Sequence, residues 1–278
     1  MHARRPFSSA LLAVTLLLAG SGFAPNATAT GILNDTGVTF CGGMGRIVHD
    51  CVSVHVSGEE ASRGRDALAR TGLLDKIGGS ASNNGFDYSK ISDDGRVLPA
   101  SVSHHDSRWR CTRDNVTGLI WERKNRDPGH LRSIRNRYTW YDPSSRDGHP
   151  GEQGAPDTCA LGGKACNTLN YIDAINQARL CGYTDWRLPT PEELLTLYNF
   201  ADTYAAQGHN QVAAPPLDPE YFPVQDRGAY WSATPAAESR EQAWVMIFGW
   251  GHLQPAQRST PQSVRLVRGQ RHLHGEPR

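Results

Sequence analysis

The chain has 278 residues with 29 Lys and Arg against 28 Asp and Glu. This near balance lacks the bulk positive charge typical of nucleic-acid-binding proteins, and no recognised nucleic-acid motif occurs. After the N-terminal run, no segment is apolar enough to cross a membrane. The length suffices for one large hydrophobic core or two smaller ones.

The N-terminus has the three parts of a secretory signal peptide. Arg4 and Arg5 precede an apolar run over residues 10–19, and small residues follow up to Ala29. We expect residues 1–29 to be removed after Ala29 and the mature chain to be exported to the periplasm or the extracellular space. The apolar run is too short for a permanent anchor, so no membrane span is expected after cleavage.

All the cysteines follow this cleavage site. An even number of them in an exported chain predicts disulfides, and the absence of a CxxC pattern disfavours zinc and redox sites. Several pairings are possible. Pairs close in sequence are favoured, which leaves one long-range link: Cys41–Cys51, Cys159–Cys166 and Cys111–Cys181.

Residues 30–107 are rich in Gly, Ser, Asn and Asp and predict a loop-rich N-terminal region that packs on the main domain. Within it, residues 52–56 alternate as a short strand does, and residues 62–76 have helical potential. Residues 78–85 are typical of a loop.

From residue 108 large aromatic side chains become frequent. Residues 117–122 predict a turn into a strand, and residues 138–140 predict a second short strand. Residues 142–164 are rich in Gly, Pro, Ser and Asp and predict a long loop. Loops of that length are usually functional or disordered.

Two helices follow this loop. Apolar residues on one face predict a helix over residues 170–180, and Gly182 suits the position just past its end. Thr190, followed by proline and three residues later by Glu193, predicts a second helix that opens with a capping box. This helix is expected to end near Ala201.

Three strands are predicted near the C-terminus, over residues 230–234, 243–248 and 263–268, with a turn at residues 249–251. The order of strands, then helices, then strands favours an α+β fold over a doubly wound sheet. Residues 270–278 form a polar tail.

Six short motifs stand in order along the second half of the chain: residues 114–122, 138–140, 185–190, 230–234, 243–245 and 264–268. Together they resemble the Lcl-C family, the C-terminal domain of a collagen-like bacterial adhesin. The resemblance covers about residues 108–269. The collagen-like region of that adhesin is absent here, so trimerisation through it is not implied.

The resemblance implies a C-type-lectin-like fold with two main helices and short antiparallel strands, shared with formylglycine-generating enzymes. It also implies an exported or surface module, because the domain of the founding adhesin is linked to attachment and to binding of sulfated polysaccharide.

Between residues 108 and 137, Lys and Arg clearly outnumber Asp and Glu. Clustered guanidinium groups suit sulfate or phosphate, which they bind with two hydrogen bonds in a fixed fork. A solvated basic loop is the alternative. The candidate ligand-binding residues in this stretch are Arg123, Lys124, Arg126, Arg132 and Arg135.

Aromatic side chains next to predicted loops are the second group of candidates, because exposed rings stack on sugar faces. They are Trp140 with Tyr141, and Trp250 with His252. Core packing is favoured for each tryptophan, least of all for Trp250. Trp121, Trp231 and Trp244 are expected in the core, and Trp109 and Trp186 in the core or partly buried.

Catalytic and metal sites find little support. The stretch His104, His105, Asp106 and Ser107 has the ingredients of a hydrolytic triad, but such adjacent residues do not converge as a triad requires. Cys159 and Cys166 are better explained as a structural disulfide than as a reactive pair. The acidic residues near residue 220 are scattered, and the tripeptides with which lectins of this fold bind calcium do not occur in the chain. Neither a metal nor another cofactor is therefore expected.

The sequence therefore predicts an exported, non-catalytic binding module. Its expected ligand is a polysaccharide, sulfated or otherwise anionic, or another surface partner, and not nucleic acid. The alternatives are an envelope structural or protein-interaction module and, less favoured, an enzyme related to formylglycine-generating enzymes.

Overall fold

The computed structural model describes residues 35–38, 40–43, 46–48, 61, 64–80, 84–200 and 217–269. The predicted signal peptide, Cys51, the predicted strand at residues 52–56 and the polar tail lie outside these residues.

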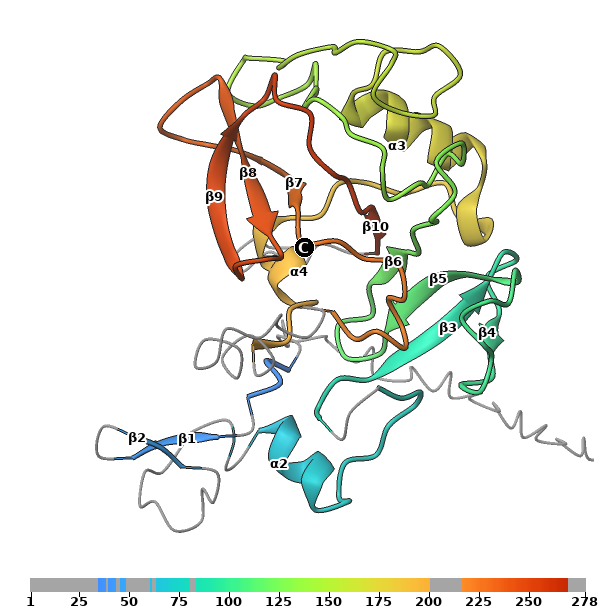
Figure 1. Cartoon of the computed structure of the whole chain (residues 1–278), viewed down its shortest axis with the longest axis vertical. Helices are drawn as coiled ribbons and strands as arrows, with labels where there is room; N and C mark the ends of the chain where they lie inside the picture. The colour runs from blue at the N-terminus through green and yellow to red at the C-terminus, as the bar shows by residue number, and fades with distance from the viewer. Residues whose placement is uncertain are drawn as a thin grey trace, which may run out of the picture.

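Short strands and few helices make up the described chain (Figure 1). The strands are β1 (Cys41–Gly43), β2 (Arg46–Val48), β3 (Tyr88–Ser92), β4 (Val97–Leu98), β5 (Trp109–Asp114), β6 (Ile120–Glu122), β7 (Ala229–Pro235), β8 (Gln242–Ile247), β9 (His252–Gln257) and β10 (Val267–Arg268). The helices are α2 (Arg65–Arg70), α3 (Thr168–Gln177), α4 (Pro191–Leu195) and the 3₁₀ turn η1 (Leu180–Gly182).

The strands form one five-stranded sheet in the order β10-β6-β5-β3-β4, one three-stranded sheet β7-β8-β9 and the pair β1-β2. All pairs are antiparallel. The α+β class with antiparallel strands is therefore confirmed.

The five-stranded sheet joins the N-terminal region to the rest of the chain. β3 and β4 precede residue 108, and β3 pairs with β5 from Tyr88 opposite Asp114 to Ser92 opposite Trp109. The predicted boundary at residues 107 and 108 thus runs between strands of one sheet.

The three-stranded sheet lies between two groups of buried side chains. Successive residues of a strand point to opposite faces. Trp231 and Val245 face one group, and Tyr230 and Met246 face the other. Because both faces of β7 and β8 are covered, these two strands show little of the alternation typical of a half-exposed sheet, whereas β9 is largely exposed.

Both helices opened by capping residues are present, but their ends differ from the prediction. The side chain of Asn167 caps α3, which begins earlier than expected. The helical segment ends near residues 179–181, where Arg179 and Cys181 adopt positive φ. The capping box at Thr190 is confirmed. However, α4 ends at Leu195, because the chain then turns and buries Leu197 and Tyr198 in the second group.

The C-terminal strands also differ in part. The predicted turn at residues 249–251 leads into β9, which the sequence did not reveal, and β10 is shorter than residues 263–268. Residues 138–140 form only isolated bridges, to Gln262 and Asn167. Trp109, Trp121, Trp186 and Trp231 are buried as expected, whereas Trp244 is partly exposed.

Two predicted disulfides are confirmed. Cys111–Cys181 joins β5 to η1, and Cys159–Cys166 closes part of the long loop. Cys41 is also disulfide-bonded, and its predicted partner lies outside the described residues. Such bonds are typical of proteins outside the cytoplasm. Among the described residues, no helix is long and apolar enough to span a membrane.

A candidate anion-binding site

A pocket of about 580 Å³ opens beside the ends of β5 and β6. This volume lies within the range of small-ligand sites. Three parts of the protein line it. They are residues 104–107 before β5, Arg110 of β5 together with residues 123–126 after β6, and residues 219–224. The lining residues are His104, His105, Asp106, Ser107, Arg110, Arg123, Lys124, Asn125, Arg126, Pro219, Pro223 and Val224.

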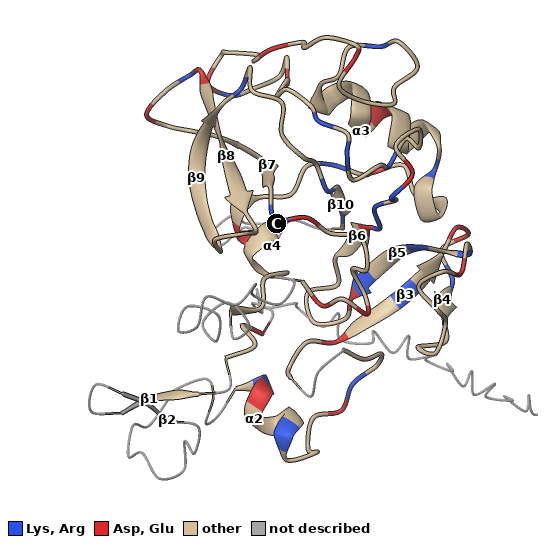
Figure 2. Ribbon diagram, viewed as in Figure 1, with Lys and Arg blue, Asp and Glu red and all other residues tan. Residues whose placement is uncertain are grey.

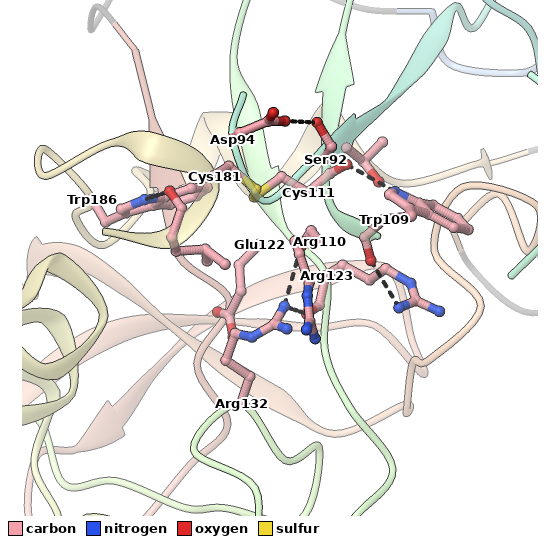
Figure 3. The surroundings of a disulfide bond; sticks show 12 residues. Ser92, Asp94, Trp109, Arg110, Cys111, Glu122, Arg123, Arg132, Cys181 and Trp186 are labelled. Atoms are coloured by element: carbon pink, nitrogen blue, oxygen red, sulfur yellow. Dashed lines mark hydrogen bonds between the residues drawn. A yellow bond between two sulfur atoms is a disulfide. The ribbon is translucent and has the colours of Figure 1, made fainter. Parts of the chain in front are cut away.

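Strand pairing brings the arginines of the pocket together. Cys111 of β5 lies opposite Glu122 of β6, so Arg110 and Arg123 are neighbours where the two strands end. The Arg123 amide donates to the Arg110 carbonyl at 3.2 Å. Figure 3 shows Arg110, Arg123 and Arg132 gathered beside the Cys111–Cys181 disulfide, which fixes β5 at this point.

Arg123 is held in a defined position. Its Nη1 donates to the Trp109 carbonyl at 3.1 Å, its Nη2 donates to the His104 carbonyl, and its guanidinium lies 4.6 Å from the centre of the Trp109 ring. Burial, with the neighbouring charges of Arg132 and Arg110, lowers the pKa of Arg123 to about 10. The side chain therefore stays charged at neutral pH, with its hydrogen-bonding geometry set before a ligand arrives.

Arg132, predicted to bind ligand, lies beneath the pocket wall. It is 5% exposed, and its Nη1 donates to the carbonyls of Arg110 and Arg123. Burial lowers its pKa. This side chain supports the wall and does not face the solvent.

Lys124 lines the pocket but is only 3% exposed. Its Nζ lies 2.9 Å from Oε1 of Glu122 and 3.0 Å from the hydroxyl of Tyr171. Burial lowers the pKa of Lys124 to about 8. The positive charge of Lys124 is therefore balanced by the buried carboxylate of Glu122.

The pocket carries an excess of positive charge. Four Lys or Arg side chains and one acid, Asp106, line it, and Asp106 is paired with Arg108 at 2.6 Å. Arg110 makes no side-chain hydrogen bond or ion pair with the described residues. Arg126 donates to the Pro223 carbonyl at 3.0 Å. Figure 2 shows basic residues recurring on β3, on β5 and along the chain after β6. An anion entering here meets guanidinium groups with unused donors.

The other predicted ligand residues are dispersed. Arg135 is exposed but does not line the pocket. Tyr141 is half-buried and bridges to Gly151. Trp250, 78% exposed, lies in the turn between β8 and β9, and His252 is the first residue of β9; neither lines the pocket.

The structure does not support Trp140 as a ligand-binding residue. It is 1% exposed, its Nε1 donates to the Ser232 carbonyl at 2.9 Å, and the Arg258 guanidinium lies 4.2 Å from its ring centre. A side chain enclosed in this way offers no face to a sugar.

Sequence reasoning missed several lining residues. Arg110 lies inside the basic stretch and was detectable from its charge. His104 and His105 were considered only as catalytic groups, and nothing in their local sequence places them opposite Arg126. Pro223 and Val224 approach from about a hundred residues away, a proximity that only the folded chain reveals. Among the described residues, no cluster of three or more His, Cys, Asp or Glu is placed to hold a metal.

These features define a disulfide-linked α+β domain with a basic pocket at a sheet end. The chain matches the Lcl C-terminal domain over residues 110–268, more than half of its length, and belongs to that family. No curated protein matches it. The family match begins within β5, so β3, β4 and residues 104–107 precede it.

Proposed function

We propose that this chain is an exported, non-catalytic binding module whose pocket holds the anionic groups of a polysaccharide, sulfated or otherwise charged. The observation that carries the proposal is the group of three arginines that line the pocket, Arg110, Arg123 and Arg126, while the one acid of the lining, Asp106, is already paired with Arg108. Family membership supports the proposal, which includes a C-type-lectin-like arrangement of the domain.

The pocket has the two kinds of surface that a charged sugar needs. Arg110 and Arg126 offer planar donors that suit sulfate, phosphate or carboxylate groups. Pro219, Pro223 and Val224 offer an apolar side on which the C–H face of a sugar ring packs. The anion and the ring of one ligand residue would therefore be bound by different walls.

Heparin chromatography of the mature, oxidised protein tests the proposal. The pocket variant Arg110→Gln with Arg126→Gln is compared with Arg113→Gln and Arg135→Gln, a control that removes the same charge from exposed positions outside the pocket. We expect wild type and control to elute at similar salt and the pocket variant to elute earlier, because each lost anion contact weakens binding and its salt dependence. Absence of wild-type retention at low salt, or equal shifts in both variants, would overturn the proposal.

A further inference from the structure

We propose that His104 and His105 contact the bound anion and that their protonation strengthens its binding in mildly acidic solution. This inference rests on the proposed function and assigns a regulation to the same pocket. Both residues line the pocket and precede the family match, so the pH response would be a property added by the N-terminal region.

The two imidazoles are exposed at the pocket and lie against each other. Their ring centroids are 4.4 Å apart with planes inclined by 51°. Neither ring makes a side-chain hydrogen bond or ion pair with the described residues. Their nitrogens are therefore available to a ligand that enters between residues 104–107 and the arginines of the pocket, Arg110, Arg123 and Arg126.

Hydrogen bonds from neighbouring basic side chains fix the segment that carries the two histidines. Lys90 of β3 donates from Nζ to the carbonyls of Ala100 and Val102, at 2.7 and 2.8 Å. Arg123 donates to the His104 carbonyl, and Arg108 donates from Nε and Nη2 to the two carboxylate oxygens of Asp106. Hydrogen bonds from three basic residues thus hold the histidines beside the pocket, so their position does not depend on the ligand.

The charged groups around the imidazoles come from every neighbouring segment. The strands and the chain after β6 bring Arg110, Arg123, Lys124 and Arg126. Asp106 and its partner Arg108 come from the same segment as the histidines. Glu220, from the third wall, lies 3.6 Å from Lys90.

An anion placed against an imidazole favours the protonated form of the ring. Linkage is reciprocal, so protonation of the ring must favour the anion to the same extent. Histidine is the side chain whose charge changes within the physiological pH range, whereas guanidinium groups keep their charge there.

Other lining groups do not explain a change over that range. The pKa of Arg123 is about 10 and that of Lys124 about 8, so both stay largely protonated at neutral pH and below. His130 lies outside the pocket, and burial with the charges of Arg132 and Arg110 lowers its pKa.

The test measures heparin affinity at about pH 5.5 and about pH 7.0, the interval in which imidazole changes charge. Wild type is compared with the double variant His104→Gln, His105→Gln and with His252→Gln, a control that removes an exposed imidazole outside the pocket. We expect wild type and control to bind roughly fivefold more tightly at the lower pH, as two exposed charge contacts allow. The double variant should lose most of this gain and keep its affinity at neutral pH.

Calorimetry in buffers of different ionisation enthalpy gives a second, independent readout. Net proton uptake on binding heparin near pH 6 is expected, and uptake near zero is expected for the double variant. Binding without proton uptake, or an unchanged pH response in the double variant, overturns this inference and leaves the proposed function standing. Absence of wild-type binding at both pH values overturns both.

Discussion

Glu122 and Lys124 form an ion pair in the interior of the protein, with both side chains closed off from solvent. The Tyr171 hydroxyl donates to Glu122, and the Leu266 amide donates to its second oxygen at 3.0 Å. Burial opposes the charged form of Glu122. The charge of Lys124 and these hydrogen bonds outweigh burial and hold the pKa of the carboxyl below its usual value.

Breaking this pair on one side should be costly. Lys124→Met leaves a buried carboxylate without its cation, and the loss of unfolding free energy should be about 3–5 kcal/mol. Urea unfolding at pH 7 measures it. The double variant Glu122→Gln, Lys124→Met should lose clearly less than the sum of the two single changes. Additive losses would show that the two charges do not depend on each other.

The two described disulfides should differ in their contribution. Cys111–Cys181 spans 70 residues and Cys159–Cys166 spans 7. Replacing each pair by alanine should cost about 4 and about 2 kcal/mol respectively, since the longer loop restricts the unfolded chain more. Guanidinium unfolding of the two variants makes the comparison, with thiol counting to confirm that the remaining bonds are intact. A greater loss from the short loop would contradict the expectation.

Asp147 should confer acid sensitivity on the long loop. Burial alone would raise the pKa of Asp147, but hydrogen bonds from Ser145 and Arg258 lower it to about 2. A carboxyl with a lowered pKa in the folded state stabilises the protein above its ordinary pKa, and this contribution disappears as the pH falls toward 2.

We therefore expect Asp147→Asn to increase hydrogen exchange in residues 142–164 at pH 7, with the difference from wild type vanishing near pH 2. Asp157→Asn, an exposed carboxylate in the same loop, is the matched control and should change little. A difference that persists at pH 2 would point to a contact independent of charge.

The capping box at α4 should be measurable by itself. Thr190 accepts from the Glu193 amide at 3.2 Å, and Glu193 accepts from the Thr190 amide at 2.8 Å. Thr190→Ala should cost about 1 kcal/mol in thermal or denaturant unfolding. Thr184→Ala, at an exposed position, should have almost no effect. Equal effects would remove the cap as the explanation.

Features governed by local chemistry could be predicted from the sequence. The capping box follows from side chains three residues apart. The bond between Cys159 and Cys166 follows from their proximity in the chain, and the burial of Trp121 and Trp231 follows from strand-like surroundings. In each case the deciding partner lies close in sequence or in a simple pattern.

Features that depend on distant partners could not be predicted. In the sequence Lys124 and Arg132 look like surface charges. In the folded chain Glu122 and Tyr171 contact Lys124, and the carbonyls of Arg110 and Arg123 accept from Arg132. β3 contains the charged Lys90, which is buried because Glu220 and two loop carbonyls receive its ammonium group. A basic stretch therefore turned out to be partly pocket lining and partly internal support.

The two outermost strands of the five-stranded sheet, β4 and β10, are each only two residues long. Short outer strands give another molecule little backbone to pair with. A fragment limited to the family match would lose β3 and uncover the long, continuous flank of β5. The segment before residue 110 therefore covers this edge of β5, and we expect a chain shortened to its family domain to pair through the exposed strand and aggregate.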